Sequence, residues 1–263
     1  MNRATILCGN YAYLYPRKLG DLPTASDAIM AAGYDGLYCF VQASEPGTPD
    51  RDAMVRIVRT AKFTAPPVLF GGAADLREGL DSCVERYRRV VDFAAALGAP
   101  QIVDCGGSID HRETYLAMMR LTAAYAASKG TAIAMKPHGD ICLSCRDMID
   151  VHREVDHPAF GLCLDPGNLL YYSNGQNRPE DDLEEMAPLV TVFIAKDCVL
   201  RDDGPEVLVV PGTGLVDFPG VWRRLVDVGY EGPVCVEKVP GDDLETMNSN
   251  FVTTLQYLRE QLR

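Results

Sequence analysis

The sequence predicts a (β/α)8 TIM barrel that occupies residues 1–263 as a single domain. Eight short apolar runs alternate with longer amphipathic segments, and eight units in 263 residues make about 33 residues each, the size of one βα unit. Several runs are apolar throughout, as expected of parallel strands that helices cover. An open doubly wound sheet is the alternative, but no G-x-G-x-x-G motif follows a strand, and we therefore expect no nucleotide cofactor.

The predicted strands follow one another in chain order, and the later ones end in polar or charged residues. They cover residues 4–8, 34–41, 65–71, 100–105, 131–138, 160–165, 190–196 and 232–239.

Four of the amphipathic segments are predicted to be helices from their end signals or their position after a strand. Residues 23–33 and 75–98 each end at a glycine, which is typical of a helix C-cap. Residues 216–230 and 244–262 follow the seventh and eighth strands and are expected to be the last two helices.

The composition narrows the class of protein. The 25 basic and 37 acidic residues leave a net charge of −12, which argues against nucleic acid or an anionic membrane surface as a partner. No run of 18 apolar residues is present, so we expect no transmembrane helix. Nine scattered cysteines in a chain large enough to bury its own core favour a reduced, cytoplasmic setting.

Polar residues gather where the later strands are predicted to end. In a TIM barrel the carboxyl ends of the strands form the active-site face. The candidates at these ends are Asp104, Lys136, His138, Asp165, Asn168, Lys196, Asp197, Glu237 and Lys238.

Lys136 and His138 are two residues apart on one predicted strand and should share a face. We expect Lys136 to point into the barrel mouth and pair with Asp165 or Glu237, where burial could lower its pKa; an exposed strand-end lysine is the alternative. His138 could be a base, a metal ligand, a hydrogen-bonding partner of the substrate, or a structural residue.

Two acidic residues follow or interrupt apolar strands. Asp165 lies in LCLDPGN and should be either a ligand or a helix cap, with the turn at Pro166–Gly167 bringing Asn168 back to its carboxylate. Glu237 stands in an apolar strand, where a glutamate is expected to be paired or catalytic.

Three other features carry less specific signals. Cys142-x-x-Cys145 lacks a second C-x-x-C, so a zinc site is disfavoured. Residues 211–218 resemble a glycine-rich phosphate loop without its lysine, and we expect a turn that enters a helix at Asp217. The polar loop 173–185 could cover the site or meet a partner subunit in a homo-oligomer, a state that the sequence leaves open.

Residues 131–239 resemble the xylose isomerase-like barrel superfamily. The resemblance rests on the segments AMKPHGD, FGLCLDPGNLLYY, FIAKDC and VPGTGLVDFPGVWRRLVDVGYEGPVCVEK. The group includes inosose dehydratase, ketose 3-epimerases and endonuclease IV, whereas the first half of the chain matches only in its βα rhythm. Endonuclease IV itself is disfavoured, because four histidines are too few for its metal cluster and the net charge opposes DNA binding.

The resemblance implies one divalent metal at the barrel mouth, held by a Glu, an Asp, a His and a Glu on strands 5 to 8. Asp165 and Glu237 match two of these positions, but Lys136 and Ile194 stand at the other two. A lysine ammonium would repel a divalent cation and could neutralise both carboxylates itself. A displaced Mn²⁺, Mg²⁺ or Zn²⁺ site on His138, Asp165 and Glu237, and a metal-free site, therefore remain alternatives.

The resemblance also implies an enzyme of carbohydrate metabolism, an isomerase or epimerase that transfers a proton next to the carbonyl of a small sugar or polyol. Glu237 would be the general base, with Lys136 or His138 as the opposing acid. The residues expected to hold substrate hydroxyls are Asn168, Asp104 and Lys196.

Three alternatives to an isomerase or epimerase stay open. They are a metal-free lyase or dehydratase, a Schiff-base enzyme that uses Lys136, and a non-catalytic barrel that binds sugar.

Overall fold

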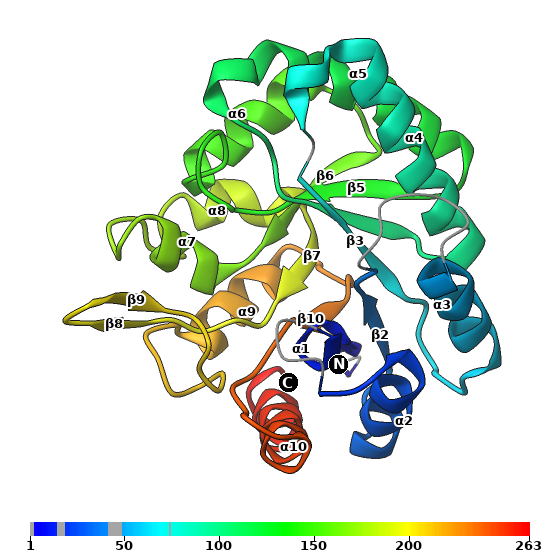
Figure 1. Ribbon diagram of the computed structural model, residues 1–263. Helices are drawn as coiled ribbons and strands as arrows, with labels where there is room; N and C mark the ends of the chain where they lie inside the picture. The colour runs from blue at the N-terminus through cyan, green and yellow to red at the C-terminus, as the bar shows by residue number, and fades with distance from the viewer. Residues whose placement is uncertain (1–2, 15–18, 42–48, 74) are drawn as a thin grey trace.

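The protein is an eight-stranded parallel barrel surrounded by helices, which confirms the predicted fold class (Figure 1). The computed structural model describes residues 3–14, 19–41, 49–73 and 75–263. The strands pair in the order β1-β10-β7-β6-β5-β4-β3-β2, and β1 pairs with both β2 and β10, so the sheet is closed. The barrel strands are β1 (Ile6–Gly9), β2 (Gly36–Cys39), β3 (Val68–Gly72), β4 (Gln101–Asp104), β5 (Ala132–Met135), β6 (Phe160–Leu164), β7 (Val190–Ile194) and β10 (Val234–Val236).

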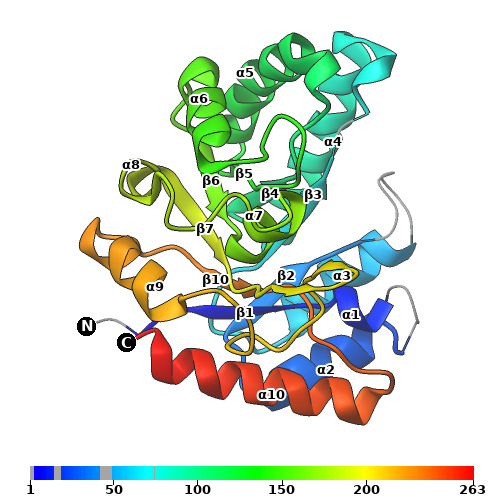
Figure 2. The same cartoon turned by 90° about the vertical axis from the view of Figure 1, so that its left-hand side faces the viewer.

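Helices follow the strands and form the outer layer, in which α2 packs against α10 (Figure 2). The longer helices are α2 (Leu22–Ala32), α3 (Pro49–Thr60), α4 (Leu80–Leu97), α5 (Arg112–Ser128), α6 (Cys145–Val155), α9 (Phe218–Asp227) and α10 (Leu244–Gln261). The shorter elements are α1 (Tyr11–Leu14), α7 (Pro166–Tyr172), α8 (Leu183–Met186), and the 3₁₀ turns η1 (Leu76–Glu78), η2 (Ile109–His111) and η3 (Ala187–Leu189).

Two local features differ from the sequence-based expectation. The segment 75–98 is not one helix, because Gly79 adopts a left-handed φ of 84° that separates η1 from α4. After β7 the chain also forms an unpredicted antiparallel hairpin of β8 (Val199–Arg201) and β9 (Gly204–Glu206), visible at the left of Figure 1.

Alternate residues of each strand face two different apolar layers. One layer lies between the barrel and the helices, and the other fills the barrel interior. The interior layer consists of Leu7, Tyr38, Phe40, Val68, Val103, Ala134, Cys163, Val192, Ile194 and Cys235. Because side chains alternate along a strand, the residue two positions after an interior residue also points into the barrel, at its mouth.

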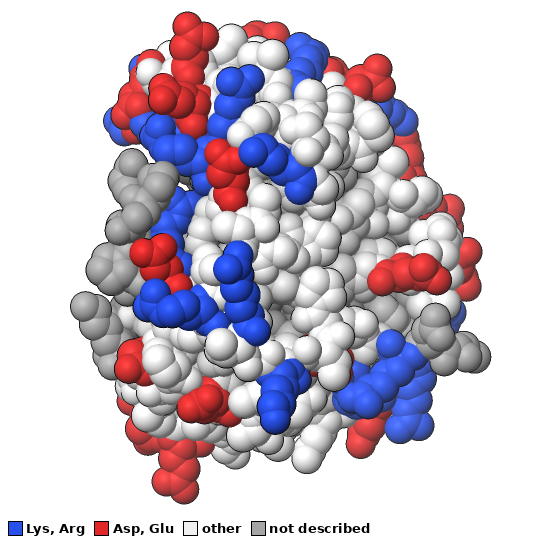
Figure 3. All heavy atoms as spheres, turned by 90° about the vertical axis from the view of Figure 1, so that its right-hand side faces the viewer, with Lys and Arg blue, Asp and Glu red and all other residues white. Residues whose placement is uncertain are grey.

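The charged side chains lie mainly on the outer surface. On the face shown in Figure 3, Lys and Arg groups are interspersed with Asp and Glu groups around a broad uncharged area. Among the helices of the described residues, none is both long and apolar enough to cross a membrane.

Candidate active site

Four charged residues lie at the carboxyl ends of neighbouring strands, each two positions after an interior residue. Ala134 is followed by Lys136 and Cys163 by Asp165; in the same way, Ile194 precedes Lys196 and Cys235 precedes Glu237. The strand period turns all four side chains into the barrel, directly above the apolar interior layer. We call Lys136, Asp165, Lys196 and Glu237 the charge quartet.

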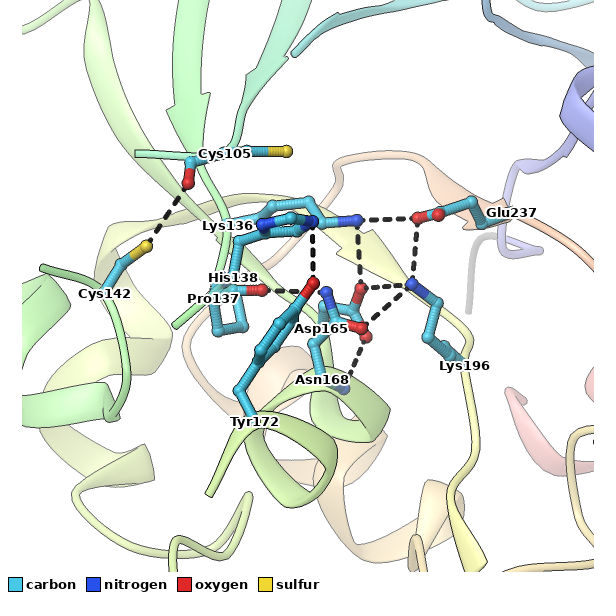
Figure 4. Close-up of polar contacts among 10 residues, drawn as sticks. All are labelled: Cys105, Lys136, Pro137, His138, Cys142, Asp165, Asn168, Tyr172, Lys196 and Glu237. Carbon is cyan, nitrogen blue, oxygen red and sulfur yellow. Dashed lines mark hydrogen bonds and ion pairs between the residues drawn. The ribbon is translucent and has the colours of Figure 1, made fainter. Parts of the chain in front are cut away.

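The charge quartet is one connected network (Figure 4). Lys136 Nζ lies 2.7 Å from Glu237 Oε2 and 3.3 Å from Asp165 Oδ2. Lys196 Nζ lies 3.0 Å from the same oxygen of Asp165 and 3.1 Å from the same oxygen of Glu237. Two ammonium groups thus share two carboxylate oxygens, and the formal charges of the four residues cancel.

All four members of the charge quartet are buried, and the pKa values of two of them are strongly shifted. Burial by itself raises the pKa of Glu237, but the charges of Lys136 and Lys196 outweigh it and hold that pKa well below its usual range. Burial also lowers the pKa of Lys136, and the carboxylates of Glu237 and Asp165 outweigh that effect and raise it well above its ordinary value. The expectation of a lowered Lys136 pKa was therefore wrong, because it counted desolvation without the two carboxylates.

Asp165 serves two purposes at once, through its two oxygens. Oδ1 accepts a hydrogen bond from the backbone N–H of Asn168 at 3.0 Å and caps α7. Oδ2 forms the ion pairs with Lys136 and Lys196. The first turn of α7 also packs closely against β7, since a Cβ at Gly167 would lie 2.8 Å from Cγ of Lys196. Glycine at this position lets the helix start beside the lysine stem.

Asn168 joins the network from the first turn of α7. Its Oδ1 accepts from Lys196 Nζ at 3.1 Å, and its Nδ2 donates to the carbonyl of Pro137 at 2.8 Å. The amide thus links the lysine to the residue that follows Lys136 in the chain.

His138 and Tyr172 form a second, neutral pair beside the charge quartet (Figure 4). The Tyr172 hydroxyl lies 2.8 Å from Nε2 of His138, and the ring centroids are 4.7 Å apart. Partial desolvation, followed by the charges of Lys136 and Lys196, lowers the pKa of His138 to about 4, although the side chain is partly exposed. Partial desolvation also raises the pKa of Tyr172 to about 12. Both side chains are therefore uncharged at neutral pH.

A cavity of about 240 Å³ opens above these groups and joins the polar network to an aromatic wall. The described residues that line it are Tyr11, Phe40, Phe70, Lys136, His138, Asn168, Tyr171, Tyr172, Lys196, Val207, Glu237 and Lys238. A larger depression of about 410 Å³ shares Tyr11, Tyr171, Val207 and Lys238 with it. Concave sites with an apolar wall and a few convergent polar groups are typical of small-molecule sites.

Sequence reasoning did not assign a role to several lining residues. Tyr172 and Tyr171 follow the DPGN segment, whereas Tyr11 and Phe40 follow β1 and β2, two strands that end in uncharged residues. The sequence FGLCLDPGNLLYY held a signal for Tyr172, because seven positions separate it from Asp165 and two helical turns bring it back over the same face.

Asp104, expected to hold a substrate hydroxyl, faces away from the cavity. It comes one residue after the interior Val103 and therefore points to the helix layer. There it accepts hydrogen bonds from Tyr115 Oη at 2.5 Å and from the Gly106 N–H at 2.8 Å. Burial raises the pKa of Asp104 to about 6. A direct contact with substrate is therefore not expected.

The donor set does not fit the divalent metal that the resemblance implies. The ammonium groups of Lys136 and Lys196 stand between the carboxylates of Asp165 and Glu237, where a cation would lie. Within the described ranges no three His, Cys, Asp or Glu side chains gather as a metal site, including the predicted displaced set with His138. We therefore derive no step through a metal.

The less specific sequence features lie outside the cavity. Cys142 and Cys145 are buried, and the Cys142 thiol donates to the Cys105 carbonyl at 3.5 Å (Figure 4). The glycine-rich loop surrounds the protein's own Asp197 carboxylate, which accepts from the N–H groups of Gly212 and Gly214 at 2.9 and 2.7 Å. This loop then enters α9 at the N-cap Asp217, as predicted.

Loop 173–185, a candidate for a cover over the site, packs beside α6 instead. Arg146 of α6 forms ion pairs with Asp182 at 2.5 Å and with Glu185 at 2.6 Å. None of the residues 173–185, all of which the structure describes, lines the cavity.

Comparison with known proteins gives matches over most of the chain. The family model described as "Xylose isomerase-like TIM barrel" matches residues 26–261. The chain is 24% identical over 274 residues to a 3-dehydroshikimate dehydratase of Pseudomonas putida, a match that covers 93% of this chain and 41% of that protein. It is 25% identical over 154 residues to an inosose dehydratase of Yersinia enterocolitica, covering 52% of this chain and 51% of that one.

The fold also matches solved structures. A D-allulose 3-epimerase from Methylomonas sp. superposes with a TM-score of 0.74 at 18% identity, and the match covers 98% of each chain. At this identity the likeness concerns the fold alone. The chain spans about half the length, or less, of the two curated relatives that it matches.

Proposed function

Because the chain belongs to the xylose isomerase-like TIM barrel family, we propose that it is an enzyme that transfers a proton next to the carbonyl of a sugar- or polyol-derived substrate. The observation that carries the proposal is the charge quartet at the floor of a cavity, with the neutral His138–Tyr172 pair beside it. Convergent ionisable groups of this kind, several with strongly shifted pKa values, are typical of proton-transfer sites.

Lys136 is the cation best placed to polarise the substrate carbonyl. An ammonium has three N–H donors, and Lys196 uses three on Asp165, Asn168 and Glu237. Lys136 uses at most two, on Glu237 and Asp165, which leaves one donor for a carbonyl oxygen that becomes an enolate. Lys196, expected from the sequence to bind a hydroxyl, is better explained as a positioning residue.

Glu237 is the proposed base. Its Oε2 accepts hydrogen bonds from the ammonium groups of Lys136 and Lys196, whereas no described residue donates a hydrogen bond to Oε1. The carboxylate is ionised at neutral pH, and its second oxygen is available to take a proton from the carbon beside the carbonyl. Its lowered pKa makes it a weak base, so the transfer depends on Lys136 stabilising the enolate that forms.

Tyr172 and His138 are the proposed acid on the other side of the cavity. Neutral His138 that donates from Nε2 leaves the phenolic hydrogen of Tyr172 for the substrate, and then holds the phenolate that forms. The raised pKa of Tyr172 keeps this hydrogen in place until the substrate takes it.

The same enolate leads to two reactions. In an isomerase or epimerase, the outcome predicted from the sequence, a proton returns to carbon or oxygen and no atom is lost. In a dehydratase, the electron pair of the broken C–H bond forms a C=C bond, the β-hydroxyl leaves with a proton from Tyr172 as water, and Glu237 later returns its proton through solvent. The names of the two curated relatives favour dehydration as the second candidate.

One experiment distinguishes these reactions. The protein would be incubated in D₂O with 3-dehydroshikimate, an inosose and a ketohexose, and each mixture followed by NMR and mass spectrometry. Dehydration produces a conjugated product that has lost one water, whereas epimerisation keeps the atoms and places deuterium on carbon. No exchange and no product with any of these ketones would contradict the proposal and favour a non-catalytic binder.

A further inference from the structure

We propose that Lys238 forms an anion-binding subsite that selects substrates bearing a carboxylate group. This inference rests on the proposed function, because it names the substrate class of the same cavity. It begins from Lys238, a side chain that neither the charge quartet nor the His138–Tyr172 pair uses.

The inner cavity carries more positive than negative charge. Lys136, Lys196 and Lys238 line it, and Glu237 together with the adjoining Asp165 supplies two carboxylates. His138 is neutral, so three cations face two anions inside the cavity, while the carboxylates of Glu206 and Asp242 line only the larger depression outside it. The excess of positive charge is thus confined to the inner cavity, in a chain whose net charge is −12.

Lys238 stands at the rim of the cavity, without a contacting partner in the part of the chain that the structure describes. It follows the base Glu237 directly and lines both the cavity and the larger depression outside it. Among the described residues Lys238 has no ion pair and no hydrogen bond, in contrast to Lys136 and Lys196. A half-buried ammonium without a partner is unfavourable, and an anionic ligand would supply the missing partner.

The lining of the cavity favours a carboxylate over a phosphate. No arginine is among the described lining residues, and the cavity of about 240 Å³ is small. A phosphate carries up to two charges and usually recruits several donors, whereas a carboxylate is a monoanion that one ammonium can neutralise. The carboxylate would lie at the outer end of the substrate, and the carbonyl would lie over Lys136.

The test measures binding without turnover. Quinate, a cyclic polyol carboxylate, and its uncharged methyl ester would be titrated by calorimetry into the intact protein and into Lys238→Met, Lys238→Arg and Lys62→Met. Lys62 is exposed in the loop between α3 and β3, at the opposite end of the barrel, and controls for the change in net charge. Thermal melts would confirm that each variant is folded.

We expect the wild-type protein to prefer quinate, and Lys238→Met to weaken quinate binding about 10- to 100-fold while leaving the ester unchanged. Lys238→Arg and Lys62→Met should keep the preference. Equal affinity for the two probes, no detectable quinate binding, or a preference that survives Lys238→Met would overturn the subsite. Any of these results would leave the proposed proton transfer untouched. Conversely, if quinate binding depends on Lys238 but no ketone reacts, the proton-transfer proposal fails and the carboxylate subsite stands.

Discussion

Lys136 Nζ lies 2.7 Å from Glu237 Oε2, although 101 positions separate the two residues in the sequence. The contact joins the end of β5 to the end of β10 across the barrel mouth, and Lys196, two residues after β7, reaches the same carboxylate oxygen. Folding therefore assembles the site from strands that lie far apart in the chain. The energetics of this pair also makes the site sensitive to the loss of any one charge.

Replacing Glu237 with Gln should abolish measurable turnover and destabilise the protein. The substitution removes the base and leaves two buried ammonium groups with one carboxylate, which costs about 3 kcal/mol in the free energy of unfolding. The double variant Lys136→Met/Glu237→Gln removes one charge of each sign and should recover part of that stability, but no activity. Denaturant titration and the NMR assay check both; full activity in Glu237→Gln would rule out its assignment as the base.

Replacing Tyr172 with Phe should lower kcat by roughly 10²–10⁴-fold with a smaller change in KM. The structural reason is that only the proton donor is removed, while the ring and the start of α7 stay in place. Tyr171→Phe is the matched control, because the neighbouring ring also lines the cavity. Equal activity of the two variants would show that Tyr172 is not the acid.

The activity should have no inflection near pH 6.5, the ordinary pKa of histidine. The pKa of His138 is lowered to about 4, first by partial desolvation and then by the charges of Lys136 and Lys196, so the group loses its neutral form only as the pH falls toward that value. The pKa of Tyr172 is raised to about 12, so its proton stays bound on the alkaline side. A pH–kcat profile from about pH 5 to about pH 9 tests this; an inflection near 6.5 that disappears in His138→Gln would contradict it.

Removal of metal should leave the activity unchanged. The lysines already neutralise the carboxylates that a divalent cation would use. Protein purified without chelator would be analysed for Mn, Mg and Zn and assayed before and after dialysis against EDTA. A stoichiometric metal that is lost in Asp165→Ala, together with the activity, would contradict this.

Asp104→Asn should change how stability depends on pH without impairing substrate binding. Burial raises the pKa of Asp104 to about 6 from an unfolded value near 3.9, so the folded state binds an extra proton between these values. This carboxyl therefore reduces stability as the pH rises from about 4 to about 6, by on the order of 1–3 kcal/mol, and the asparagine variant should lack that loss. Denaturant unfolding at several pH values measures it; a raised KM would instead support contact with substrate.

The barrel and much of the site could be predicted from the sequence because strand ends carry their own signal. Each member of the charge quartet follows an apolar strand. Because side chains alternate along a strand, a residue two positions after an interior residue also points into the barrel. Asp104 was expected to contact the substrate because only its polarity was considered. It comes one position after Val103, which faces the barrel interior, so its side chain points to the opposite side of the strand.

Other features depend on contacts that are not local. The raised pKa of Lys136 requires knowing that two carboxylates meet one ammonium. The direct contact between Tyr172 and His138 depends on where the short α7 places its last residue relative to the loop that follows β5. The β8–β9 hairpin was missed because its three-residue strands are too short for a periodic pattern.

The seven-residue helix α7 holds three kinds of groups in one rigid piece: its cap Asp165, the amide of Asn168 and the phenol of Tyr172. A tilt of this helix would shift the charge balance, the lysine geometry and the proton donor together. Evolution or a protein engineer could therefore retune the reaction by exchanging residues 165–172 as one cassette, while the barrel that presents them stays as it is.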